Sequence, residues 1–116
     1  MLESEPSIHR IRSLQAILRM VPKGLGLGQL AALFAVAAEA GLSVNDLSDR
    51  IEVPQQTASR YAAQLMGRYQ DSLSDDPLTP LVEQRVSVED PRKRALFLTP
   101  HGLAVVEAII AAGWRS

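Results

Sequence analysis

The chain has 116 residues, of which 47% are apolar and 22% are charged, and this composition predicts one soluble globular domain. Its formal net charge is −1, so the total charge alone predicts neither a nucleic-acid nor a membrane partner. Because the sequence contains no cysteine, disulfides, thiolate metal sites and thiol nucleophiles are excluded.

Apolar residues near the N-terminus recur at steps of three and four, and they predict a helix that begins near Ser7 and ends before Pro22. The members of this stripe are Ile8, Ile11, Leu14, Leu18 and Val21.

The glycine-rich segment 23–28 follows the first predicted helix. Its spacing matches neither a dinucleotide-binding loop nor a P-loop, and no apolar strand precedes it, so we interpret it as a connection between helices.

Two helices are predicted next. Residues 27–40 are apolar on nearly every face, which is typical of a short helix buried inside a small domain, and Gly41 ends it. Ser43 and Asp46 have the spacing of a capping box and predict a third helix over residues 44–51.

Pro54 then opens a fourth helix over residues 55–67. Glu52 lies in the tight turn before it, where such sequences often have glycine. We therefore expect a left-handed backbone at Glu52, at a cost of about 1 kcal/mol.

The second half of the chain is predicted to form a β-hairpin and a last helix. A polar, turn-rich connection over residues 67–80 leads to two short strands, over residues 81–88 and 94–98, with a charged tip between them. Thr99 is the expected N-cap of the last helix and Pro100 its first residue. The apolar stripe of this helix consists of Leu103, Val106, Ile109, Ile110 and Trp114.

The segment 46–65 has the pattern of a helix-turn-helix, in which apolar residues close two short helices around a tight turn. These residues are Leu47, Ile51, Val53, Ala58, Ala62 and Leu65. Small and polar residues remain for the outer face of the second helix, namely Gln55, Gln56, Thr57, Ser59, Arg60, Ala63 and Gln64. Glutamine can pair with adenine, arginine with guanine, and hydroxyl groups with phosphates or base edges. The pattern therefore predicts a recognition helix in the major groove of double-stranded DNA.

The placement of charge supports this interpretation. Residues 53–70 contain Arg60 and Arg68 and no Asp or Glu, so the predicted recognition surface is basic although the whole chain is not. The alternative is a polar, solvated helix in a protein–protein adaptor, since glutamine and arginine are ordinary surface residues.

Over about residues 30–102 the sequence resembles the MarR family of bacterial and archaeal winged-helix transcription regulators. The most specific part is Asp90-Pro91-Arg92, followed by a strand that ends in Leu98-Thr99 and then by Gly102. This run is similar to the family's D-x-R wing motif and its L-T-x-x-G motif. The resemblance implies that Arg92 enters the minor groove and that Asp90 holds it through an ion pair.

The chemistry of the hairpin tip agrees with the resemblance. An arginine on a protruding hairpin suits the narrow, electronegative minor groove of A·T-rich DNA, and Lys93 and Arg94 are predicted to contact phosphates. The alternative is that the tip is charged only because it is solvated. The predicted fold is thus mainly α with a small β-hairpin: a winged-helix core over residues 27–99, flanked by helices over residues 7–21 and 100–115, in one domain over residues 1–116.

The sequence departs from the family in the connection 67–80, which is longer and more acidic than usual, and in its reduced outer helices. Some relatives bind small-molecule effectors between their dimer helices, and we do not expect such a ligand here. In the MarR resemblance the terminal helices pair across a two-fold axis, so a homodimer is predicted; packing of these stripes within one chain is the alternative. The residues predicted to form the dimer are Ile8, Ile11, Leu14, Leu18, Leu103, Val106, Ile110 and Trp114.

The predicted function is sequence-specific binding of double-stranded DNA by a homodimeric transcriptional repressor. The alternatives are a winged-helix adaptor that binds protein, or a DNA-binding accessory factor in replication or plasmid maintenance. We expect no enzymatic activity, cofactor or metal, because the sequence has no nucleophile with a base, and His9 and His101 are isolated. Neither a secretory signal nor a convincing membrane span is found, so a cytoplasmic location is expected.

Overall fold

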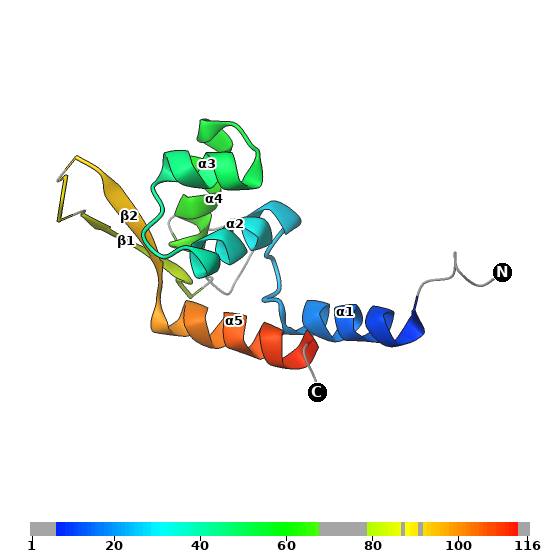
Figure 1. Ribbon diagram of the computed structural model, residues 1–116. Helices are drawn as coiled ribbons and strands as arrows, with labels where there is room; N and C mark the ends of the chain where they lie inside the picture. The colour runs from blue at the N-terminus through cyan, green and yellow to red at the C-terminus, as the bar shows by residue number, and fades with distance from the viewer. Residues whose placement is uncertain (1–6, 68–78, 87, 91, 114–116) are drawn as a thin grey trace.

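A computed structural model describes residues 7–67, 79–86, 88–90 and 92–113 of the chain (Figure 1). The elements in chain order are α1 (Ile8–Met20), α2 (Leu27–Ala38), α3 (Val44–Ile51), α4 (Gln55–Leu65), β1 (Val82–Val86), β2 (Arg94–Leu98) and α5 (Pro100–Gly113). Helices α2, α3 and α4 pack against one another, the β-hairpin projects from this cluster, and α5 lies below it beside α1. The predicted class, mainly α with a small hairpin, is confirmed.

The core lies where the three central helices meet the base of the hairpin. Its large, fully buried side chains come from α2, α3, α4, the residue before β1, and β2: they are Leu33, Leu47, Leu65, Leu81 and Leu96. Burial of one such leucine stabilises the fold by roughly 1.5–3 kcal/mol, so the five together are a major part of the driving force.

Three predicted helix starts are capped, two of them, at Ser43 and Thr99, by the residues expected as caps. Ser43 Oγ accepts a hydrogen bond from Asp46 N, and Asp46 Oδ2 accepts one from Ser43 N, which completes the capping box of α3. Thr99 Oγ1 accepts from Gly102 N at 2.9 Å and caps α5. Ser7 Oγ accepts from Arg10 N and caps α1. These bonds satisfy backbone donors that would otherwise have no partner.

The hairpin is antiparallel, with Val82 opposite Leu98 and Gln84 opposite Leu96. Its first strand begins one residue later than predicted, because the backbone of Leu81 bonds to other segments. Leu81 N donates to Leu65 O at the end of α4, and Leu81 O accepts from Thr99 N before α5. Leu42 pairs with Leu96 on the other edge of β2. The base of the wing is therefore fixed to the backbone of the helical core on both sides.

Helices α1 and α5 pack against each other within the chain. The contact is close, since a Cβ atom on Gly113 would lie 2.3 Å from Ile17 Cδ1. Even so, α1 buries none of its residues, and the two helices expose an apolar surface that consists of Ile8, Ile11, Leu14, Leu18, Leu103 and Ile110. Val106 was expected on this surface but is buried in the core of its own chain. Trp114 lies outside the described residues.

Among the described helices, none combines the length and the apolar content that crossing a membrane would require.

Candidate nucleic-acid interface

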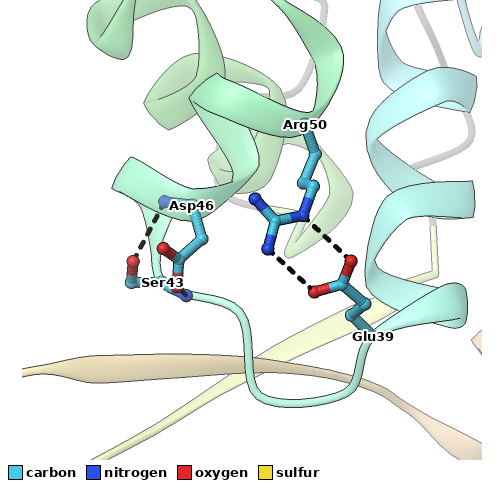
Figure 2. Close-up of polar contacts among 4 residues, drawn as sticks. All are labelled: Glu39, Ser43, Asp46 and Arg50. Atoms are coloured by element: carbon cyan, nitrogen blue, oxygen red, sulfur yellow. Dashed lines mark hydrogen bonds and ion pairs between the residues drawn. The ribbon is translucent and has the colours of Figure 1, made fainter.

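The first helix of the helix-turn-helix is braced against α2 by an ion pair (Figure 2). Arg50 Nε and Nη2 on α3 donate to the two carboxylate oxygens of Glu39 at the end of α2, at 2.9 and 3.2 Å. The hydrogen bond from Arg50 lowers the pKa of Glu39 below its ordinary value of 4.5. Because both side chains are about half exposed, the pair orients α3 more than it stabilises the fold.

The turn between α3 and α4 aims the second helix. Glu52 has φ 55° and ψ 50°, which confirms the expected left-handed conformation at a residue other than glycine. Ser48 Oγ donates to Val53 O at 2.6 Å, and Val53 N donates to Ser48 O at 3.1 Å. These bonds close the turn and fix the direction in which α4 begins.

Helix α4 presents a polar face to solvent. Gln55, Gln56, Ser59 and Arg60 are exposed, Thr57 is half-buried, and Ala58, Ala62 and Leu65 are buried against the core. Two residues expected on the outer face lie differently.

Ala63 is buried, at 9% exposed. Gln64 is half-buried, and its Oε1 accepts a hydrogen bond from Gln29 Nε2 of α2 at 2.7 Å. The cause is the close approach of α2 to α4, where a Cβ on Gly28 would lie 2.4 Å from the ring of Tyr61. Arg68, the other arginine of the predicted basic surface, lies outside the described residues.

At the wing, the structure brings Asp90 and Arg92 together. Asp90 Oδ1 accepts from Arg92 N at 3.0 Å and lies 3.6 Å from Arg92 Nε. The Arg92 side chain is 94% exposed and therefore extends into solvent from this anchor. Lys93 and Arg94 are also exposed. The tip carries three cationic side chains, one of them held at its base by a carboxylate.

Two hollows connect the helix with the wing. The helix hollow, of about 590 Å³, runs along α4 and is lined by Gln56, Ser59, Arg60, Gln64 and Gln84, among others. The wing hollow, of about 480 Å³, lies between the starts of α3 and α4 and the hairpin, and its lining includes Asn45, Gln55, Gln84, Arg92 and Lys93. Recognition helix and wing therefore border two neighbouring hollows, whose linings share Val44 and Gln84.

Sequence reasoning missed Gln84. Its register opposite Leu96 puts it on the face of the hairpin that Val82 shares, turned toward the helices. Strict alternation along β1 could have found it, because a polar residue between Val82 and Val86 interrupts an otherwise apolar face. On the strand's other face, Arg85 is occupied by an ion pair with Glu83 and by the Phe97 ring, 4.5 Å away.

A model of the MarR family matches residues 23–68. Comparison with curated proteins gives no match. Among solved structures, the chain is similar to the YusO protein from Bacillus subtilis, with a TM-score of 0.63 and 20% identity over 90% of this chain and 64% of that one. It is similar to the PcaV transcriptional regulator from Streptomyces coelicolor, with a TM-score of 0.61 and 23% identity over 87% of this chain and 66% of that one.

It is also similar to MepR from S. aureus in a complex with DNA, with a TM-score of 0.65 and 20% identity over 89% of this chain and 73% of that one. The chain spans 64% of the length of YusO and 66% of that of PcaV.

The order of helices, the tight turn before α4 and the hairpin that follows define a winged helix-turn-helix protein. The predicted resemblance to the MarR family is confirmed: the chain has the winged-helix fold of MarR-family transcription regulators.

Proposed function

We propose that this protein is a transcriptional regulator that binds specific sequences in double-stranded DNA, acting as a homodimeric repressor in the cytoplasm and without enzymatic activity. The observation that carries the proposal is the pair of neighbouring hollows along α4 and the wing, whose linings share Val44 and Gln84. Amides, a hydroxyl and a guanidinium line the helix hollow, and three cationic side chains line the wing hollow together with Asp46. This order of groups matches a duplex, which offers base edges in the major groove and phosphates and a narrow minor groove beside it.

In this arrangement α4 lies in the major groove. Gln55, Gln56 and Ser59 are exposed near its start, and Arg60 is within the same outward stripe, so these side chains reach base edges. Thr57 is half-buried and contributes to the phosphate side of the contact. Helix α4 has no acidic residue to repel the backbone.

The wing would enter the adjoining minor groove through Arg92. Asp90 restricts the arginine at its base, which lowers the entropy lost when the side chain is inserted. Lys93 and Arg94 contact the phosphates on either side. MepR, which has the same fold, has been crystallised with DNA, and this supports a DNA partner for the present chain.

The exposed surface of α1 and α5 supports the dimer. Ile8 is 67% exposed and Leu18 is 65% exposed, and a large apolar surface exposed on two packed helices is uncommon on a monomer. Two copies paired through this surface about a two-fold axis would address half-sites one helical turn apart, and occupation of such a site in a promoter blocks transcription. A small-molecule effector is not part of the proposal.

Two alanine variants separate DNA binding from an adaptor role. Arg60→Ala should weaken binding to a duplex enriched from a random pool by about 1–3 kcal/mol and relax its base preference, while Arg92→Ala should weaken binding mainly to A·T-rich flanks. Arg12→Ala on α1 removes the same charge outside α4 and the wing and serves as the control. Affinities equal to that of the control in both variants would favour the adaptor.

A further inference from the structure

The side chain of Gln29 has a fixed orientation. Gln29 occupies the third position of α2, and its Oε1 accepts a hydrogen bond from Gly26 N just before the helix. A backbone N–H can only donate, so the atom that faces it has to be the oxygen of the amide. The Nε2 of Gln29 is thereby directed away from the start of α2, toward α4.

This orientation dictates that of Gln64 on the recognition helix. Gln29 Nε2 can only donate, and its partner at 2.7 Å is Gln64 Oε1. The oxygen of Gln64 is consequently engaged by α2, and its nitrogen is the end left for another partner. Gln64 lines the helix hollow together with Ser59, Arg60 and Gln84. Among the described residues, Gln64 Nε2 has no hydrogen-bond partner.

The chemistry of this amide differs from that expected of a free glutamine. Bidentate pairing with adenine uses the oxygen and the nitrogen of a glutamine together. In Gln64 the oxygen already accepts from Gln29, so the residue is suited to donate one hydrogen bond to an acceptor. DNA offers such acceptors as phosphate oxygens and as base-edge atoms, for example N7 and O6 of guanine.

We propose that Gln29 is a positioning residue that holds Gln64 as a hydrogen-bond donor to DNA. The inference rests on the proposed function and adds a residue that itself lies outside the contact surface. The link is rigid because the neighbouring residues also pack closely, with Gly28 of α2 against the ring of Tyr61. The start of α2 thereby determines which end of a side chain on α4 is presented to the duplex.

Gln29→Glu tests the proposal because it changes only one end of the side chain. The carboxylate still accepts from Gly26 N, so the cap of α2 is kept. Its second oxygen can only accept, and Gln64 then has to turn its Nε2 toward α2 and present Oε1 to the DNA. Leu27→Glu is the matched control: it adds the same charge two residues away, on a side chain that is 85% exposed.

The unaltered chain and both variants are compared on a duplex enriched from a random pool and on its single-base-pair variants. We expect Gln29→Glu to differ from Leu27→Glu by at least about fivefold in affinity, the size of one lost hydrogen bond. A changed preference at one base pair would place the acceptor on a base edge, and an even loss across all duplexes would place it on a phosphate. Equal behaviour of the two variants would overturn the proposal.

Gln64→Glu provides a second measurement. It keeps an acceptor for Gln29 Nε2 and replaces the free donor with an acceptor, so we expect a loss of at least about fivefold in affinity with little change in the midpoint of thermal unfolding. Binding as tight as that of the unaltered chain would contradict the donor role. If the unaltered chain enriches no duplex at all, the proposed function fails, and that result is read before any variant is compared.

Discussion

Glu52 shows how one residue carries a backbone cost for the helix-turn-helix. With φ at 55°, it adopts a conformation that is unfavourable for side chains with a Cβ. We predict that Glu52→Gly raises the free energy of unfolding by about 0.5–1 kcal/mol, since the relief of strain exceeds the extra entropy of glycine in the unfolded chain. Urea unfolding followed by circular dichroism measures this change in the free energy of unfolding. A loss of stability would show that Glu52 makes a favourable contact that outweighs the strain.

Gly102 is required for a different reason, which is the space it leaves. A Cβ at this position would lie 1.9 Å from Leu81 O, in the segment that joins the hairpin to the core. We predict that Gly102→Ala destabilises the fold by more than about 3 kcal/mol, because the obstacle is backbone and cannot rotate away. Ala104→Ser, at an exposed position of the same helix, is the control. Thermal unfolding of the two variants at the same midpoint would refute the steric argument.

Local signals explain which residues could be predicted from the sequence. The Ser43–Asp46 capping box, the Thr99 cap and the left-handed Glu52 each depend on neighbours within a few residues, and all three are confirmed. The burial of Ala63 and the bond between Gln64 and Gln29 depend on how α2 packs across α4. That packing joins residues 35 positions apart, and no local pattern encodes it.

At the scale of elements, the carboxylates around α3 should make stability depend on pH. The pKa of Asp46 is lowered from its ordinary value of 3.8, mainly by the backbone hydrogen bond from Ser43, and that of Glu39 is lowered from 4.5 by Arg50. The folded state binds these protons less readily than the unfolded state. The two ionised carboxylates therefore stabilise the fold fully above about pH 5.5, and this stabilisation is lost as the pH falls through their lowered pKa values.

We predict that the double variant Glu39→Gln with Asp46→Asn depends less on pH. As the pH is lowered from about 5.5 to 3, its free energy of unfolding should fall less steeply than that of the unaltered chain. Glu107→Gln, which removes an exposed carboxylate on α5 that has no ion pair with a described residue, should leave the slope close to that of the unaltered chain. Identical slopes for the double variant and the unaltered chain would mean that these two carboxylates do not stabilise α3.

Element boundaries were predicted well where the backbone bonds are local. Helix α3 over Val44–Ile51 and strand β2 over Arg94–Leu98 match the sequence-based ranges. Strand β1 begins one residue later than predicted because Leu81 bonds to the ends of two helices, and Val88 lies in the turn, 99% exposed. An apolar run shows that a segment is extended or buried, but its pairing partners decide where a strand ends.

At the scale of the whole molecule, the apolar surface of α1 and α5 is expected to hold two copies together. We predict that Leu14→Asp combined with Ile110→Asp raises the dimer dissociation constant by at least about 100-fold, because both charges are buried twice in a two-fold interface. Both residues are exposed in the single chain, at 59% and 55%, so its fold should survive. Light scattering at several concentrations measures the mass, with Gln15→Asp as the control. A monomer before substitution would contradict the proposed dimer.

The sequence alone could not decide whether the apolar stripes of α1 and α5 pack within one chain or between two copies. The two apolar stripes predict that the terminal helices pack against apolar residues. Part of this packing lies within the chain, because Val106 is buried in the core and Gly113 lies close to Ile17. The position of the wing relative to the helix was also undetermined from the sequence, because the connection 67–80 is longer and more acidic than is usual in the family. In the structure, Gln84 lines both hollows, and this shows how the wing lies relative to the helix.

The central claim is that α4 and the wing read one duplex in a sequence-dependent way. The most direct measurement is a titration, near physiological salt, of the duplex enriched from a random pool against a scrambled duplex of the same composition. We expect binding to the enriched duplex to be tighter by about 10³-fold or more, with two related half-sites about one helical turn apart. Equal affinity for the two duplexes would contradict it.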